Sequence, residues 1–86
     1  MMVISFDDQE LCETTPEAAE YMGWQSIHVG VVGLHSRSVD AIRDLVREIA
    51  IDTILPDLDE GLALVGFGLD ARRDAILYYV AREGSH

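Results

Sequence analysis

The sequence contains no lysine, a single cysteine and only two prolines, and its six cationic side chains are all arginines, against sixteen carboxylates. Affinity for nucleic acids depends mainly on Lys and Arg that neutralise phosphates, so a net charge of −10 argues against direct binding to DNA or RNA. The same argument disfavours anionic membranes. An acidic surface instead attracts a basic protein and accelerates the encounter with it. An acidic, Arg-only composition also fits a GC-rich genome or a salt-adapted cell, so charge alone does not specify a partner.

Cysteine and long apolar runs are equally scarce. Cys12 is alone, which excludes an intrachain disulfide and a Cys-based zinc site and is typical of a cytoplasmic chain. The sequence contains neither an apolar run approaching the roughly 18 residues of a membrane span nor the pattern of a signal peptide. Its 86 residues predict one domain over 1–86, and an apolar fraction of 49% predicts that this domain folds despite its charge. One small core does not easily bury so many apolar residues. The apolar surface that remains favours contact with a partner protein or a homo-oligomer.

Strand and helix patterns alternate along the first half of the chain. Residues 2–6 are β-branched and aromatic and predict a strand. Thr15 as a cap and Pro16 as the first helical residue predict a two-turn helix that ends at Gly23. Residues 26–34 are largely apolar on both faces, which predicts a central strand covered on both sides or a strand at a subunit contact.

A helical repeat of apolar residues follows over residues 39–55. Ser38 is the expected N-cap, and Pro56 is expected to force Leu55 out of the helical region and end the helix. The apolar stripe of this helix consists of Ile42, Leu45, Val46, Ile49 and Ile54.

Two alternatives apply to the C-terminal part of the chain. Residues 62–69 predict a strand in which Gly66 and Gly68 mark a bulge or a close backbone approach. Residues 71–83 have the cap and stop residues of a helix, but the run AILYYVA favours a strand that is reached through a turn at DARRD. The predicted element order is β-α-β-α-β-β, an α+β fold with a small sheet and two helices packed mainly on one face.

The start of the long predicted helix is a candidate anion site. A helix N-terminus offers free N–H groups and the positive end of a dipole, and further donors are Ser36, Arg37 and Ser38. However, a P-loop requires a lysine, and a dinucleotide fingerprint requires three glycines where this chain has only Gly30 and Gly33. A plain strand-to-helix turn explains the same residues. The anion site belongs to an alternative function, a small ligand-binding or regulatory domain that is compatible with a dimer.

Patterns for catalysis and metal binding are weak. His28 and His35 are seven residues apart, which matches no metal-ligand motif, so we expect neither a metal nor a cofactor. Cys12 lies among glutamates, a setting that disfavours a thiolate nucleophile. No G-x-S-x-G elbow surrounds Ser36 or Ser38. We therefore expect no enzymatic activity.

The favoured interpretation is a small acidic protein-interaction module that binds a basic protein partner and regulates or inhibits it. Two subtypes fit: an antitoxin- or immunity-like protein, and a phage-type inhibitor whose carboxylates mimic the charge of a nucleic acid. Trp24 and Tyr21 are candidate aromatic anchors beside the acidic first helix, although a tryptophan more often fills the core. The predicted partner-binding carboxylates are Asp7, Asp8, Glu10, Glu13, Glu17, Glu20, Asp57, Asp59 and Glu60.

Overall fold

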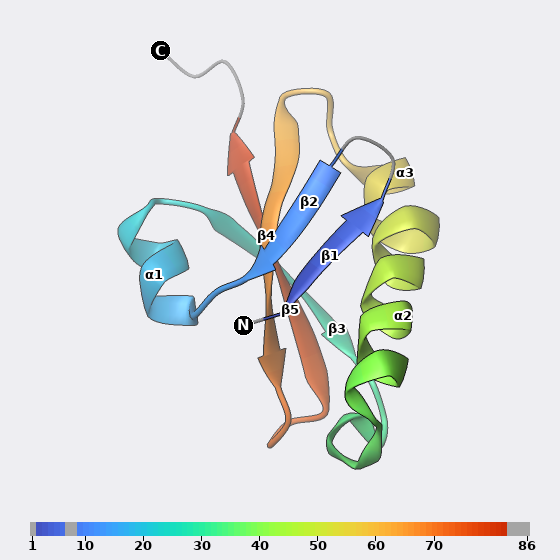
Figure 1. Ribbon diagram of the computed structural model, residues 1–86. Helices are drawn as coiled ribbons and strands as arrows, with labels where there is room; N and C mark the ends of the chain where they lie inside the picture. The colour runs from blue at the N-terminus through green and yellow to red at the C-terminus, as the bar shows by residue number, and fades with distance from the viewer. Residues whose placement is uncertain (1, 7–8, 83–86) are drawn as a thin grey trace.

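In the computed structural model, which describes residues 2–6 and 9–82, five strands form one mixed sheet. The strand order is β1-β2-β4-β5-β3; β2 runs parallel to β4, and the other neighbouring pairs are antiparallel (Figure 1). The predicted α+β class is therefore confirmed. The strands are β1 Val3–Phe6, β2 Gln9–Glu13, β3 Gln25–Gly30, β4 Leu62–Asp70 and β5 Ala75–Arg82.

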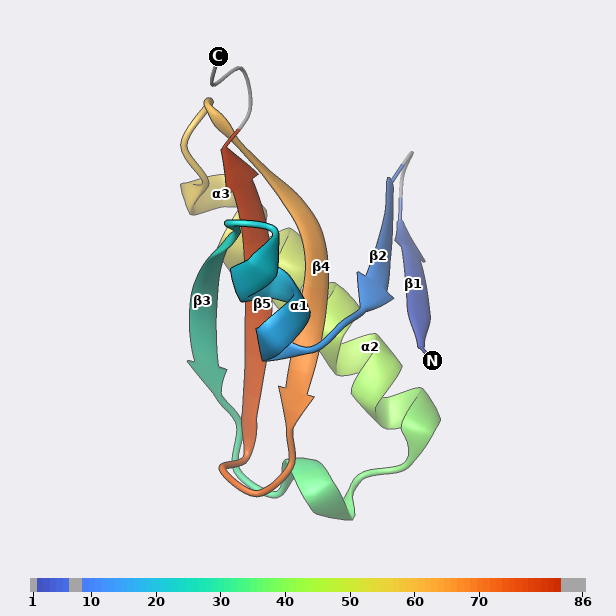
Figure 2. The same ribbon diagram turned by 90° about the vertical axis from the view of Figure 1, so that its left-hand side faces the viewer.

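A long helical segment covers one face of the sheet, and the short helix α1 lies over the other face (Figure 1 and Figure 2). The prediction that the two helices pack mainly on one face is wrong, because α1 lies on the face opposite the long helical segment. The long helical segment consists of α2 Val39–Ile49, a π-helical turn Ala50–Ile54 and α3 Leu55–Asp57; α1 is Pro16–Tyr21, and a 3₁₀ turn, Leu34–Ser36, precedes α2.

The strand β5 is enclosed on all sides, because β4 and β3 flank it and a helix covers each of its faces. Its side chains alternate between these faces. Ile76, Tyr78 and Val80 belong to the main core under the long helical segment. Leu77 and Tyr79 point to the opposite face, where they lie next to α1. The two adjacent tyrosines are therefore divided between two layers of the molecule.

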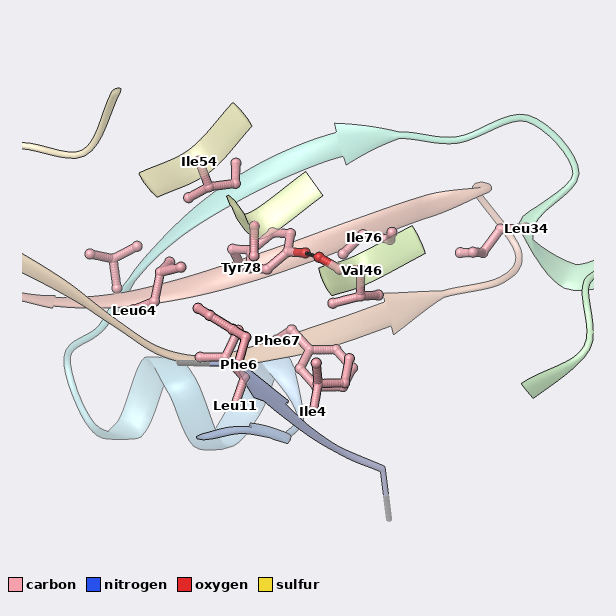
Figure 3. Packing of buried hydrophobic residues seen from close by; sticks show 12 residues of the cluster. Ile4, Phe6, Leu11, Leu34, Val46, Ile54, Leu64, Phe67, Ile76 and Tyr78 are labelled. Carbon is pink, nitrogen blue, oxygen red and sulfur yellow. Dashed lines mark hydrogen bonds between the residues drawn. The ribbon is translucent and has the colours of Figure 1, made fainter. Parts of the chain in front are cut away.

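The main core fills the space between the sheet and the long helical segment (Figure 3). The predicted apolar stripe faces it, with Val46 and Ile54 buried. The hydroxyl of Tyr78 donates a hydrogen bond to the carbonyl oxygen of Val46, which ties β5 to α2 inside the protein. Burial raises the pKa of Tyr78 above its ordinary value, so the hydroxyl remains protonated as a donor. The sheet contributes Ile4, Phe6, Leu11, Leu64, Phe67, Ile76, Tyr78 and Val80.

Several local predictions are confirmed. Thr15 and Ser38 cap their helices, because each hydroxyl oxygen accepts a backbone N–H three residues further on at 3.2 Å. The C-terminal strand and its hairpin are present, since β4 and β5 pair in antiparallel register. That register shifts between Leu64 and Gly66, as expected for a glycine-marked bulge.

The strand predicted over 26–34 is shorter than expected, because it ends at Gly30. It lies at an edge of the sheet, so the interpretation as a central strand is wrong, while the alternative of a strand at a subunit contact stays a prediction. Gly33 has a left-handed backbone with φ of 75°, which turns the chain into the 3₁₀ turn. Leu34 consequently enters the main core instead of continuing one face of the strand.

Pro56 does not end the long helical segment at the predicted residue. Leu55 stays in the helical region with φ −60° and ψ −41°, and the helix ends at Leu58, where ψ is 130°. The π-helical turn explains the difference. The N–H of Leu55 donates to the carbonyl of Ala50, five residues earlier, and the wider turn leaves room for a proline ring that has no N–H of its own.

The strand β2 is missing from the predicted element order. Leu11 is its one buried side chain, so its sequence lacks the repeated apolar positions that mark a strand. Pairing with two neighbours holds it in place: Leu11 lies opposite Ile4 of β1, and Cys12 lies beside Gly66 of β4.

The adjacent tyrosines provide a matched pair of variants. Tyr78→Phe removes the donor to Val46 and should lower the free energy of unfolding by about 1 kcal/mol. Tyr79→Phe removes a buried hydroxyl with no hydrogen-bond partner among the described residues. It should leave stability unchanged or slightly higher, since no bond is lost. Urea denaturation of both variants checks this order, and a larger loss in Tyr79→Phe would contradict the assignment.

Candidate functional site

A cavity of about 390 Å³ lies between α1 and the sheet face beneath it. One side comes from α1 and the residues that follow it, the other from β3 and β5. Since Glu20 and Ser26 are exposed, the cavity is open to solvent. The lining residues that matter here are Ala19, Glu20, Trp24, Ser26, Leu77 and Tyr79.

The C-terminal end of α1 positions the tryptophan of this cavity. Gly23 has a φ of 77°, a conformation that glycine adopts at no steric cost. The N–H of Gly23 donates to the carbonyl of Glu20, and the N–H of Trp24 donates to that of Ala19, both at 3.0 Å. This pair of bonds is the Schellman motif that closes many helices. It places Trp24, half-buried, at the cavity and not among the buried residues of the main core.

The end of α1 also presents apolar side chains to solvent. Tyr21 is 89% exposed and Met22 is 58% exposed. They directly precede the turn that carries Trp24. Two exposed carboxylates of the same helix, Glu17 and Glu20, are close to them in the chain. Aromatic anchors beside a charged rim are the arrangement found in protein interaction hot spots.

The sheet side of the cavity is rigid at Tyr79, which is only 2% exposed. Its ring lies against Gly68 of β4, where an added Cβ would stand 2.5 Å from the tyrosine hydroxyl oxygen. The absence of a side chain on Gly68 therefore leaves room for this ring. Burial, and then the negative charge of Glu17, raises the pKa of Tyr79, so its hydroxyl stays neutral.

The predicted partner-binding carboxylates are distributed over separate parts of the molecule. Glu17 and Glu20 are exposed on α1 beside the cavity. Glu10 is exposed on β2. Asp7 and Asp8 lie outside the described residues. Glu17 and Glu20 are thus the described carboxylates of this group that the structure places next to aromatic side chains and a cavity.

The other predicted carboxylates lie away from α1. Glu13 faces α2, where it lines a smaller hollow with Arg43, and its carboxylate accepts the N–H of Met2 at 3.1 Å. Three more are exposed where the long helical segment ends and leads to β4, namely Asp57, Asp59 and Glu60.

Three arginines and one histidine among the described side chains form ion pairs with other carboxylates. None of these ion pairs includes a residue of the predicted acidic set, so the charge of α1 has no compensating cation within 4.0 Å in the described part of the chain. The pairs are Arg43–Asp40 at 3.4 Å, Arg47–Asp44 at 3.9 Å, Arg73–Asp70 at 3.7 Å and His35–Asp74 at 2.7 Å.

The serine hydroxyls of the candidate anion site already form hydrogen bonds within the chain. The hydroxyl of Ser36 donates to the carbonyl of Gly33 at 2.8 Å, and the hydroxyl oxygen of Ser38 accepts the N–H of Ala41. Arg37 is exposed. These contacts agree with the plain strand-to-helix turn, in which both serines stabilise the turn and the helix start.

His35 and Asp74 form a contact that the sequence did not indicate. Nδ1 of His35 lies 2.7 Å from Oδ1 of Asp74, and the N–H of Val31 donates to the carbonyl of Asp74 at 2.5 Å. Asp74 thereby ties the chain after β3 to the β4–β5 hairpin. The hydrogen bond with His35, more than its charge, lowers the pKa of Asp74. Ser36 donates to a backbone carbonyl and not to this histidine, so the three side chains do not form a nucleophilic triad.

Side chains with metal-binding atoms do not cluster in the described ranges, 2–6 and 9–82, in the groups of three that would hold an ion. His28 is exposed on β3, while His35 is engaged with Asp74. No helix formed by these residues combines the length and the apolar character that crossing a bilayer requires.

Comparison with protein-family models, with curated proteins and with solved structures found no match.

The Asp74 contact makes stability depend on pH in the acid range. Asp74 has its pKa lowered from 3.8 by folding, so its contribution is present above that value and is lost as pH falls through the lowered pKa. Asp74→Asn keeps a residue that tolerates the φ of 49° at this position. The difference in unfolding free energy between wild type and Asp74→Asn should be largest above about pH 5 and shrink below it. Denaturation across pH checks this, and a difference that grows in acid would contradict it.

Proposed function

We propose that this chain is a small acidic protein-interaction module that binds a basic protein partner in the cytoplasm and regulates or inhibits it. The observation that carries the proposal is the surface of α1. There Glu17 and Glu20 stand exposed beside Trp24 and Tyr21, above a cavity. The single cysteine, Cys12, is free and supports a reducing compartment.

Charge and apolar contact have separate roles in this proposal. Glu17 and Glu20 are three residues apart on α1, so they lie on the same side of the helix and present adjacent negative charges. Such charges attract a basic surface and raise the association rate. Tyr21 and Trp24 supply buried area once the surfaces meet, which slows dissociation.

Two kinds of regulator fit this arrangement. An antitoxin- or immunity-like protein would cover a basic functional surface of its partner. A phage-type inhibitor would place carboxylates where a nucleic-acid-binding protein expects phosphates. In both cases the target is a protein whose exposed surface is rich in Lys and Arg.

The test compares two double variants that change the net charge equally. Glu17→Gln/Glu20→Gln neutralises α1, and Glu48→Gln/Asp52→Asn neutralises exposed positions on the long helical segment. A tagged wild-type chain first captures the partner from host extract at low and moderate salt. The α1 variant should lower the association rate constant at low salt about tenfold and weaken its salt dependence, because it removes the steering charge.

The second double variant should associate at nearly the wild-type rate. If the two double variants lowered the association rate constant equally, α1 would not be the contact surface. Preferential capture of RNA or DNA at near-physiological salt would overturn the proposal as a whole.

A further inference from the structure

The cavity under α1 has the half-buried aromatic side chain of Trp24 at its surface and an exposed carboxylate, Glu20, at its mouth. Trp24 and Tyr79 contribute two aromatic side chains, and Leu77 adds an apolar one. Glu20 lines the cavity and is exposed, as is Ser26. An aromatic surface together with a carboxylate is suited to an organic cation and repels an anion.

We propose that this cavity receives an arginine side chain of the basic partner, an inference that rests on the proposed function. The guanidinium is planar and stacks on aromatic faces. Its five N–H donors match the carboxylate of Glu20 and the hydroxyl of Ser26. Its methylene stem packs against Leu77.

The size and the charge of the cavity agree with this occupant. A volume of about 390 Å³ is near the lower end of the range of about 300–1,000 Å³ for ligand pockets, so it suits one long side chain better than a large cofactor. The lining residues in the described part of the chain include no cation, and Glu17 adds a further negative charge beside Tyr79.

The cavity is also largely preformed. The Schellman motif at Gly23 fixes the backbone of Trp24. Burial against Gly68 fixes the ring of Tyr79. Binding therefore orders few protein side chains, which limits its entropic cost.

The test uses capped oligo-arginine, oligo-lysine and oligo-citrulline peptides of equal length. Citrulline has nearly the shape of arginine but no charge. Lysine carries the same charge but lacks the planar guanidinium group. Trp24 is the only tryptophan of the chain, so its fluorescence reports directly on the cavity. Oligo-arginine should give a saturable change in emission, oligo-lysine should bind more weakly, and oligo-citrulline should not bind.

Variants locate the binding site. Glu20→Gln should weaken oligo-arginine binding about tenfold, because a charge-assisted hydrogen bond is lost. Glu48→Gln, on the long helical segment, makes the same charge change and should stay within about twofold of wild type. Trp24→Leu should lower the affinity for oligo-arginine about tenfold, as measured by calorimetry, because the aromatic face that stacks on the guanidinium is removed. If Trp24→Leu does not fold, as judged by thermal unfolding, Ser26→Ala together with Glu20→Gln decides the matter.

The outcomes separate this inference from the proposed function. Equal losses in Glu20→Gln and Glu48→Gln would mean diffuse charge attraction, which overturns the arginine cavity and leaves the acidic interaction module standing. If oligo-arginine does not bind but binding of the captured partner still depends on Glu17 and Glu20, the arginine cavity is likewise overturned and the acidic interaction module stands. Free arginine that saturates Trp24 emission as tightly as the peptide would assign the cavity to a small molecule and overturn a protein source. Absence of any basic protein partner overturns both proposals.

Discussion

The hydrogen bond from the Tyr78 hydroxyl to the Val46 carbonyl joins the interior strand β5 to the long helix α2 within the main core. Side chains alternate along a strand, so placing Tyr78 against α2 obliges Tyr79 to point to α1. A shift of one residue in β5 would exchange them and put each tyrosine in the wrong layer. The register that builds the main core thus also builds the wall of the cavity.

The second face of the sheet is covered less completely than the first. The helix over it, α1, is short, with Ala19 as its one buried side chain, and it leaves Tyr21 and Met22 in solvent. Its carboxylates lack compensating cations in the described part of the chain, whereas Asp40 and Asp44 of α2 and Asp70 at the end of β4 are paired with arginines. An enclosed core on one side and an uncompensated, partly apolar surface on the other are consistent with a module whose role is to bind another protein.

The features that the sequence predicted are those that depend on neighbouring residues. The caps at Thr15 and Ser38 and the apolar stripe of α2 follow from spacings within a few turns. The helix continues through Pro56 because a π-helical turn, which no local pattern signals, widens it. The strand β2 has one buried residue, Leu11, and is held by partners distant in sequence.

Only part of the candidate site could be predicted from the sequence, because its other residues come from strands that are distant in the chain. Glu20 and Trp24 are close in the chain and were singled out by charge and aromaticity. Leu77 and Tyr79 join them only through the pairing of β3 with β5, which spans about half the chain. One signal was present: adjacent tyrosines within an apolar strand indicate that both faces of that strand are covered.

The most direct measurement is a map of backbone amide NMR shifts when the ¹⁵N-labelled protein binds its captured partner. We predict that the largest changes fall on α1, on Trp24 and its indole N–H, and on Leu77 across the cavity. Changes confined to the outer face of the long helical segment or to the turn at Ser36–Ser38 would contradict the assignment of the contact surface to α1.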